Sequence, residues 1–267
     1  MLSGHLALLR HQLGRPLKVG DHPYRMRGFF ASRLARGDSH EPQLAAVISR
    51  ALKETTGAFI DVGVNTGQTF MKVIAADPTR TYVGFEPSIE CCHYLKRFIE
   101  DNRIRNANLI PVALADANGL QAFYSDGACD EMASLENKHG HATWVQTRVG
   151  DEILAEMDLG RIGVVKVDVE GAELRVFRGL QNTLATYRPQ VLFEQLPNFE
   201  GVGTRVRLSA ERAERNSANA ESLWSLLTGN GYSVRQVLDS GETRKIDAFS
   251  LDDVDHYFGR DYIALPS

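Results

Sequence analysis

The sequence predicts a doubly wound α/β fold, in which a mostly parallel sheet is covered by helices on both faces. From residue 58 onward, short apolar runs alternate with segments of helical periodicity. The apolar runs are nearly continuous, which is typical of parallel strands buried on both faces. Two of them end in an acid beside a turn, as expected where such a sheet binds a ligand at the carboxyl ends of its strands.

The expected elements follow one another in a regular order. Strands are expected at residues 59–62, 82–85, 109–114, 163–167, 191–194, 232–238 and 262–265. Helices are expected at residues 68–76, 89–101, 172 to about 186, and about 218–228. Residues 121–124 are expected to extend a strand or to form a hairpin arm. The polar stretches 125–146 and 197–217 are expected to be irregular.

Residues 1–56 are expected to form an N-terminal helical extension, and residues 57–267 the α/β domain. A helix is expected after Pro42, where apolar residues recur at helical spacing until Gly57. Residues 24–36 are expected to form an earlier helix that packs on the main domain, with a membrane-surface helix as the alternative.

Composition and charge exclude several classes of protein. The chain has 267 residues and a net charge of −4, which gives no general attraction to nucleic acid or to an anionic membrane. No segment is long and apolar enough to span a membrane, and the first residues are expected to form a short helix rather than a signal peptide. Three cysteines without CxxC spacing indicate reduced thiols and a cytoplasmic location.

The turn after the first expected strand carries the clearest ligand-binding pattern. Gly63 and Gly67 bracket Asn65, and Asp61 precedes the first glycine. Glycines let the backbone approach a ligand closely, whereas a dinucleotide-binding turn has a third glycine and receives a pyrophosphate. A carboxylate at Asp61 repels a pyrophosphate but can orient a cation or an amine. Because S-adenosylmethionine carries a sulfonium and an ammonium and has no phosphate, the turn favours this cofactor over NAD.

Acids also follow the second and third expected strands. Glu86 ends the second strand and precedes Pro87, a position where a carboxylate can accept both hydrogen bonds of a ribose diol. The alternative is that Glu86 only caps the next helix. Asp116 could contact the adenine amine of the cofactor, but it also lies just before the turn dipeptide Asn118-Gly119. The turn interpretation of Asp116 is slightly favoured.

A second group of charged residues follows the fourth expected strand. Lys166 and Asp168 point to the same face of that strand, and Glu170 and Glu173 lie in the first turn of the next helix. Stabilisation of the helix dipole accounts for Glu173. It accounts poorly for Asp168, which ends an apolar strand at the rim of the expected cleft.

Taken together, these segments resemble the FkbM family of S-adenosylmethionine-dependent methyltransferases. The resemblance covers about residues 58–195 and rests on FIDVGVNTG (59–67), GFEP (84–87), PVALAD (111–116), VKVDVEGAE (165–173) and VLFE (191–194). It implies a class I methyltransferase (Rossmann-like) sheet of seven strands, six parallel and one antiparallel strand next to the edge. It also implies methyl transfer, most often to a hydroxyl of a sugar or a natural-product intermediate. The chain departs from the family pattern at Val64 and at Ala133-Ser134-Leu135.

Methyl transfer to an alcohol needs a general base or a metal, because an alcohol is a poor nucleophile. Asp168 is the first candidate for either role, with Glu170 and Glu194 at neighbouring strand ends. Lys166 could hold an acid in place, or it could form a plain ion pair. Asp168 and Glu194 could together bind Mg²⁺, or they could be ordinary ion-pair partners.

Three classes of function stay open. The leading one is methylation of a hydroxyl on a small molecule, with no nucleic-acid or membrane partner. The alternatives are a nucleic-acid methyltransferase and a non-catalytic module that binds S-adenosylmethionine. His139 and His141, in the irregular stretch, are further candidates for the general base, although most loop histidines are only solvated. The pattern indicates neither the acceptor nor the oligomeric state.

Overall fold

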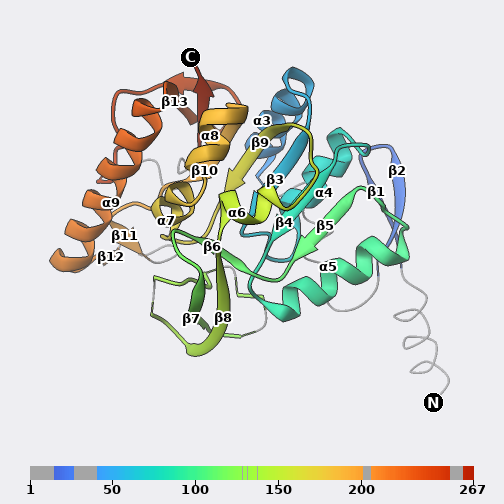
Figure 1. Ribbon diagram of the computed structural model, residues 1–267, viewed down its shortest axis with the longest axis horizontal. Coiled ribbons are helices and arrows are strands. Elements are labelled where there is room, and N and C mark those ends of the chain that lie inside the picture. Colours follow the sequence, from blue (N-terminus) through green and yellow to red (C-terminus); the bar gives the residue numbers. More distant parts are fainter. Residues whose placement is uncertain are drawn as a thin grey trace.

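An eight-stranded mixed sheet forms the centre of the computed structural model (Figure 1). The structure describes residues 15–26, 41–200, 206–252 and 261–267, apart from residues 128, 131 and 137. The strands are β3 (Ala58–Val62), β4 (Tyr82–Phe85), β5 (Ala107–Ile110), β9 (Ile162–Val167), β10 (Gln190–Glu194), β13 (Tyr232–Val237), β14 (Thr243–Lys245) and β15 (Asp261–Pro266).

The strand order β14-β13-β15-β10-β9-β3-β4-β5 confirms the doubly wound topology. The five strands β5, β4, β3, β9 and β10 are parallel to one another, and β15 is antiparallel to both β10 and β13. The expected count of seven strands is wrong by one, because β14 pairs with β13 at the edge. This strand is three polar residues long, so it has no apolar pattern that the sequence could reveal.

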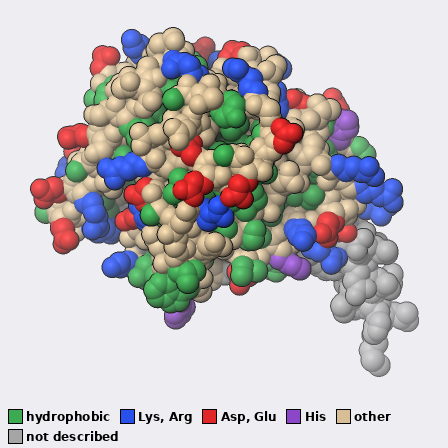
Figure 2. Space-filling view, viewed as in Figure 1, with side chains coloured by type: hydrophobic (Ala, Val, Ile, Leu, Met, Phe, Trp, Pro, Cys, Tyr) green, Lys and Arg blue, Asp and Glu red, His purple; other side chains and the backbone are tan. Residues whose placement is uncertain are grey.

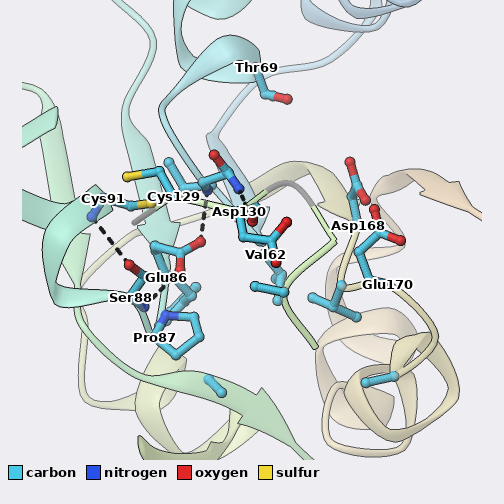
Figure 3. Close-up of a pocket in the computed structure, with 18 of the residues that line it drawn as sticks. Val62, Thr69, Glu86, Pro87, Ser88, Cys91, Cys129, Asp130, Asp168 and Glu170 are labelled. Atoms are coloured by element: carbon cyan, nitrogen blue, oxygen red, sulfur yellow. Dashed lines mark hydrogen bonds between the residues drawn. The ribbon is translucent and has the colours of Figure 1, made fainter. Parts of the chain in front are cut away.

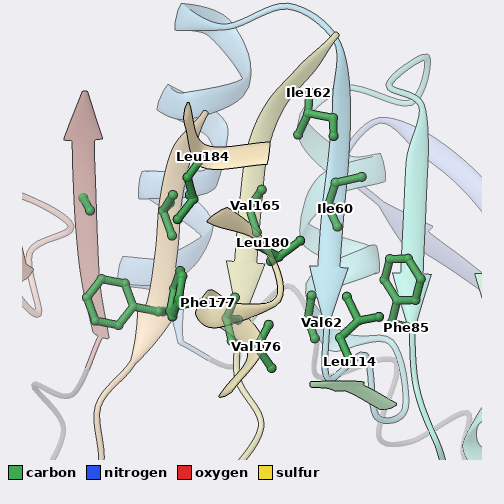
Figure 4. Close-up of a cluster of buried hydrophobic side chains, with 14 of the residues drawn as sticks. Ile60, Val62, Phe85, Leu114, Ile162, Val165, Val176, Phe177, Leu180 and Leu184 are labelled. Atoms are coloured by element: carbon green, nitrogen blue, oxygen red, sulfur yellow. The ribbon is translucent and has the colours of Figure 1, made fainter. Parts of the chain in front are cut away.

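Helices cover both faces of the sheet and bury two separate cores. On one face lie α3 (Pro42–Glu54), α4 (Gln68–Ala76) and α5 (Ile89–Asp101); on the other lie α6 (Gly150–Ala155), α7 (Glu173–Arg178), α8 (Gln181–Tyr187) and α9 (Ala210–Gly229). Alternate residues of each strand face opposite cores, so that Ile60 and Phe59 pack on different sides. Figure 4 shows Ile60 and Val165 on the face covered by Phe177 and Leu180.

A small second sheet projects from the central one at the bottom of Figure 1. It contains β6 (Ala113–Ala115), β7 (Gly119–Ser125) and β8 (His141–Val149) in the order β6-β8-β7. The hairpin arm expected at residues 121–124 is confirmed. The third strand expected at 109–114 is instead two strands, β5 and β6, in different sheets. The stretch 125–146 was expected to be irregular, but β8 begins within it, where β-branched and aromatic residues favour an extended strand.

The N-terminal extension is only partly helical. The helix expected after Pro42 is confirmed as α3, which packs against α4 and the sheet. Residues 15–26 form a hairpin instead, with β1 (Arg15–Val19) and β2 (His22–Met26) joined at Gly20, whose φ is 56°. Val19 lies beside the turn of the hairpin and Met26 at its open end, and both side chains are buried in the core. The short helix expected at the start, and most of the helix expected at 24–36, lie outside the described residues.

Two expected helix boundaries are also wrong. The helix expected at 172–186 breaks into α7 and α8 at Gly179, where a Cβ atom would lie 2.2 Å from the carbonyl oxygen of Ala115. The last helix, α9, begins at Ala210, capped by the Ser209 hydroxyl. The 197–217 connection therefore contains the start of this helix and the short strands β11 (Phe199–Glu200) and β12 (Val206–Arg207). In the described part of the chain, no helix has the length and apolarity needed to cross a membrane.

Candidate active site

A cavity of about 990 Å³ opens at the carboxyl edge of the central sheet. It lies where β3 and β9 meet, the point at which successive strands are added in opposite directions. One end is lined by the turn after β3 and the end of β4, and the other by the ends of β9 and β10. Figure 3 shows Glu86 on one side of this space and Asp168 with Glu170 on the other.

The Gly-rich turn is shaped by close backbone contacts. Gly63 has a φ of 88°, and a Cβ atom there would lie 1.8 Å from the carbonyl oxygen of Asp168. Gly67 has a φ of 93° and forms the N-cap of α4. Asn65 is also left-handed, with a φ of 48°, and its side chain donates to the carbonyl of Asp130 at 2.9 Å. The predicted turn residues Gly63 and Asn65 line the cavity directly.

Glu86 joins this turn to the end of β4. Its Oε2 accepts a hydrogen bond from the backbone N–H of Asn65, and its Oε1 accepts one from Ser88, both at 2.7 Å. Each oxygen keeps a lone pair for a further donor, such as a hydroxyl of a ribose. Burial raises the pKa of Glu86 to about 7. Pro87 lies beside it in the cavity wall. The carboxylate is therefore fixed in place, facing the cavity.

Asp61 lies behind the turn and does not line the cavity. It is fully buried, and its Oδ2 accepts a hydrogen bond from the Tyr82 hydroxyl at 2.5 Å. Among the described residues, its Oδ1 has no hydrogen-bond partner, and neither does the buried hydroxyl of Thr66. Burial raises the pKa of Asp61 to about 6. Two buried polar atoms beside the turn thus have free hydrogen-bonding capacity.

The donor set at this end fits a cofactor without phosphate groups. Among the described residues that line the cavity, Lys166 is the one basic side chain, and it lies at the other end, at β9. A phosphate normally finds basic side chains or a helix N-terminus, whereas Glu86 opposes a negative charge here. The Glu86 carboxylate, which faces the cavity, suits the hydroxyls and the cationic groups of S-adenosylmethionine.

At the opposite end, Lys166 and Asp168 form an ion pair. The Lys166 Nζ donates to Asp168 Oδ2 at 2.8 Å, and the lysine side chain is almost completely buried. Burial opposes the charge of Lys166, but the nearby carboxylates of Asp168 and Asp61 outweigh it and hold the pKa of the lysine above its ordinary value. Lys166 therefore stays a cation and orients Asp168, which is about a third exposed toward the cavity.

Glu170 and Glu194 join Asp168 in a carboxylate cluster. One oxygen of each carboxylate lies within 4.8 Å of the others. Burial, followed by the charges of Asp168 and Glu170, holds the pKa of Glu194 well above its ordinary value. Among the described residues, none donates a hydrogen bond to the Glu194 carboxylate. The sequence-predicted residues Lys166, Asp168, Glu170 and Glu194 are therefore brought together at one end of the cavity.

Three acids that the sequence reasoning missed also line this end: Glu41, Asp239 and Asp261. Asp261 begins β15 and pairs with Glu194 in the register of the sheet. Because β15 is antiparallel to β10, its first residue reaches the edge where the parallel strands end. A strand was expected at 262–265, but its direction was not assigned, so the sequence did not place Asp261 at this edge. Glu41 lies before α3, and nothing in the sequence pattern connects it with the sheet edge.

Besides Asp61 and Gly67, three further candidate residues lie outside the cavity lining. Asp116 pairs with Arg175 at 2.9 Å, away from the cavity lining. His139 pairs with Asp130 at 2.9 Å, and His141 begins β8 with an exposed side chain. Neither histidine lines the cavity. The structure therefore places no imidazole of this pair next to Asp168.

The buried carboxylates give an expected dependence of stability on pH. Burial raises the pKa of Asp61 to about 6 and those of Glu86 and Glu173 to about 7. The folded state then binds protons more tightly than the unfolded state, so the free energy of unfolding falls as pH rises from about 4 to about 7. We expect the Tm of the ligand-free protein to be higher at pH 5.5 than at pH 8, measured by thermal unfolding.

A matched variant separates this effect from other titrations. Glu173 Oε1 accepts the amides of Val169 and Gly171, and Glu173→Gln keeps an oxygen at that position. The variant should show a smaller decrease in Tm from pH 5.5 to pH 8 than the wild type does. An equal pH dependence in the variant and the wild type would show that Glu173 does not contribute, and a Tm that rises toward pH 8 would contradict the expected sign.

The strand order and the cavity at the carboxyl edge define a class I methyltransferase fold. A model of the methyltransferase FkbM domain matches residues 61–234. The chain belongs to this family, as the sequence motifs predicted.

Two solved structures and one curated protein show how far the similarity extends. A putative caffeoyl-CoA O-methyltransferase from Staphylococcus aureus is 8% identical, with a TM-score of 0.52 over 99% of this chain and 98% of that one. This similarity supports the fold alone. Methyltransferase FkbM from Methylobacillus flagellatus KT is 10% identical, with a TM-score of 0.47, over 88% of this chain and 60% of that one. Methyltransferase 1 of Beauveria bassiana (strain ARSEF 2860) is 25% identical over 144 residues, which cover 46% of this chain and 58% of that protein.

Proposed function

We propose that this protein transfers a methyl group from S-adenosylmethionine to a hydroxyl group of a small molecule. The observation that carries the proposal is a single cavity with two chemically different ends. Glu86 and the Gly-rich turn lie at one end, and the pair Lys166–Asp168 lies at the other. A volume of about 990 Å³ is at the upper end of the range for small-molecule sites, which leaves room for a cofactor and an acceptor together.

The residues at the carboxylate end would activate the acceptor. When bound, S-adenosylmethionine supplies a methyl group made electrophilic by its sulfonium. Asp168 would accept the proton of the acceptor hydroxyl as its oxygen bonds to the methyl carbon, with the sulfur–methyl bond breaking and S-adenosylhomocysteine as the leaving group. Because Lys166 occupies Oδ2, Oδ1 is the oxygen left for the acceptor. The fixed spacing between the two ends would hold donor and acceptor in line.

A divalent cation could assist at the same end. The carboxylates of Asp168, Glu170 and Glu194 provide the oxygen ligands that Mg²⁺ prefers. A cation there would relieve the repulsion among them and would lower the pKa of a bound hydroxyl. Cation binding would add to the role of Asp168 in orienting the acceptor.

The charge of the cavity argues against a nucleic-acid acceptor. The described residues of its lining include one lysine and nine acids, namely Glu41, Glu86, Glu90, Asp130, Asp168, Glu170, Glu194, Asp239 and Asp261. A polyanion would be repelled from such a lining. On the face shown in Figure 2, Lys and Arg side chains are interspersed with Asp and Glu. These features favour an uncharged or cationic small molecule as the acceptor. The Lys166–Asp168 pair argues against a non-catalytic module, because binding of the cofactor alone does not require it.

Titration calorimetry with S-adenosylmethionine tests the cofactor side. We expect Glu86→Ala to raise the Kd by about 10- to 100-fold, since it removes hydrogen bonds to a charged group. The control is Glu100→Ala on the exposed surface of α5, which should bind as the wild type does. If the wild type does not bind this cofactor, the proposed function is wrong. If Glu86→Ala binds as tightly as the wild type, the role of Glu86 is wrong.

A screen with isotopically labelled S-adenosylmethionine tests the transfer. Label should appear in hydroxyl-bearing small molecules, such as sugars, and not in RNA or DNA. Transfer to nucleic acid in preference to every small molecule would contradict the proposed acceptor class.

A further inference from the structure

One loop contacts both ends of the cavity. The described residues between Cys129 and Glu136, here called the crossing segment, follow β7 and precede β8. Within it, the carbonyl of Asp130 accepts a hydrogen bond from Asn65 Nδ2 at 2.9 Å. The Ser134 hydroxyl donates to the carbonyl of Glu170 at 2.7 Å. The crossing segment therefore connects the Gly-rich turn to the carboxylate end.

Ser134 is held firmly in its position. It is 1% exposed, and its backbone exchanges two hydrogen bonds with Tyr124 of β7, at 3.0 and 3.1 Å. Its Oγ also accepts the amide of Glu136 at 3.0 Å. With its oxygen engaged in that bond, the hydroxyl hydrogen is directed to the Glu170 carbonyl, and burial keeps water from replacing it.

Glu170 needs such a restraint because its backbone is strained. Its φ is 54°, in the left-handed region, which a residue with a Cβ atom adopts only when its surroundings hold it there. The direction of the chain at this residue decides where the Glu170 carboxylate lies relative to Asp168 and Glu194. If the backbone relaxed to an ordinary φ, the carboxylate would leave the cluster.

We propose that Ser134 is a positioning residue for the methyl-transfer site, whose hydroxyl holds Glu170 in the left-handed conformation that completes the carboxylate cluster. This inference rests on the proposed function, since it assigns a role in that same site. It adds that one segment sets the spacing between the cofactor turn and the carboxylates. A misplacement of about 1 Å in such a site can lower turnover by about 10²-fold.

Three variants test the proposal. Ser134→Ala removes the hydroxyl, and Ser134→Thr keeps it. The matched control is Thr147→Ala, which removes a buried hydroxyl that donates to the carbonyl of Ala117 at 3.0 Å in the same small sheet, away from the cavity. Amide hydrogen exchange is followed for Val169 and Gly171, which flank Glu170. The Kd for S-adenosylmethionine and, with an acceptor from the labelled screen, kcat are measured alongside.

We expect Ser134→Ala to speed exchange at Val169 and Gly171 by about tenfold, the effect of losing one buried hydrogen bond. It should also lower kcat by about 10²-fold with an unchanged Kd for the cofactor. Ser134→Thr should restore both values, and Thr147→Ala should change neither.

Two results would overturn the proposal. One is exchange at residues 169–171 that stays at the wild-type rate in Ser134→Ala. The other is an equal acceleration in Thr147→Ala, which would indicate a general loss of stability. The exchange measurement needs no ligand, so failure of the wild type to bind S-adenosylmethionine would contradict the proposed function and leave this test intact.

Discussion

Asp168→Asn is expected to lower kcat for methyl transfer by about 10²- to 10⁴-fold, the range for loss of a positioned general base. The side chain keeps its shape, and its Oδ1 can still accept a hydrogen bond from Lys166, so the fold should survive. What it loses is the capacity to accept a proton. The Kd for S-adenosylmethionine should change little, because Glu86 and the Gly-rich turn are untouched. Single-turnover kinetics with a labelled cofactor and calorimetric binding check the two expectations.

Asp116→Asn is the matched control for this variant. Asp116 also follows a strand of the α/β domain, but it pairs with Arg175 outside the cavity. It should therefore leave kcat near the wild-type value. If Asp168→Asn retains full turnover, Asp168 is not the base. If it loses turnover and cofactor binding together, its role lies in shaping the cofactor site.

The cofactor end of the site could be predicted from the sequence because it is built from local segments. Residues 59–67 and 84–87 each contain a complete strand end with its turn, so that Asp61, Asn65 and Glu86 are visible as motifs. The structure adds that Asp61 lies behind the turn and bonds to Tyr82. That detail depends on which face of β3 is turned toward the helices, and a continuous apolar run does not show it.

The carboxylate end of the cavity could be predicted only in part, because segments that are distant in the sequence build it. Asp168 and Glu170 lie in one motif, but Glu41, Asp239 and Asp261 come from three separate elements. Asp261 reaches the site through the reversed direction of β15, a tertiary feature. Likewise, the hairpin at residues 15–26 forms because it packs against α4 and α5, which local periodicity cannot indicate.

Gly63→Ala is expected to have the largest effect of any single substitution on the fold of the site. A Cβ atom at this position would lie 1.8 Å from the carbonyl oxygen of Asp168, and the φ of 88° is unfavourable for alanine. The strain in φ alone costs about 1–2 kcal/mol. The clash adds to this cost, since β3 and β9 would have to separate at the point where Asp168 N–H bonds to the carbonyl of Val62.

Gly160→Ala separates the cost of the positive φ from the cost of the steric clash. Gly160 has a comparable positive φ of 65°, but a Cβ atom there would meet no atom within 4 Å. It should therefore lose about 1–2 kcal/mol of unfolding free energy and bind S-adenosylmethionine normally. Gly63→Ala should lose at least about 2 kcal/mol more and bind no cofactor, because overpacking of this kind forces the backbone to move. Denaturant unfolding and calorimetry measure both. Equal losses of unfolding free energy in the two variants would mean that the contact between Gly63 and Asp168 does not require these strand ends to lie close together. The helices that cover the sheet would then determine the shape of the cavity.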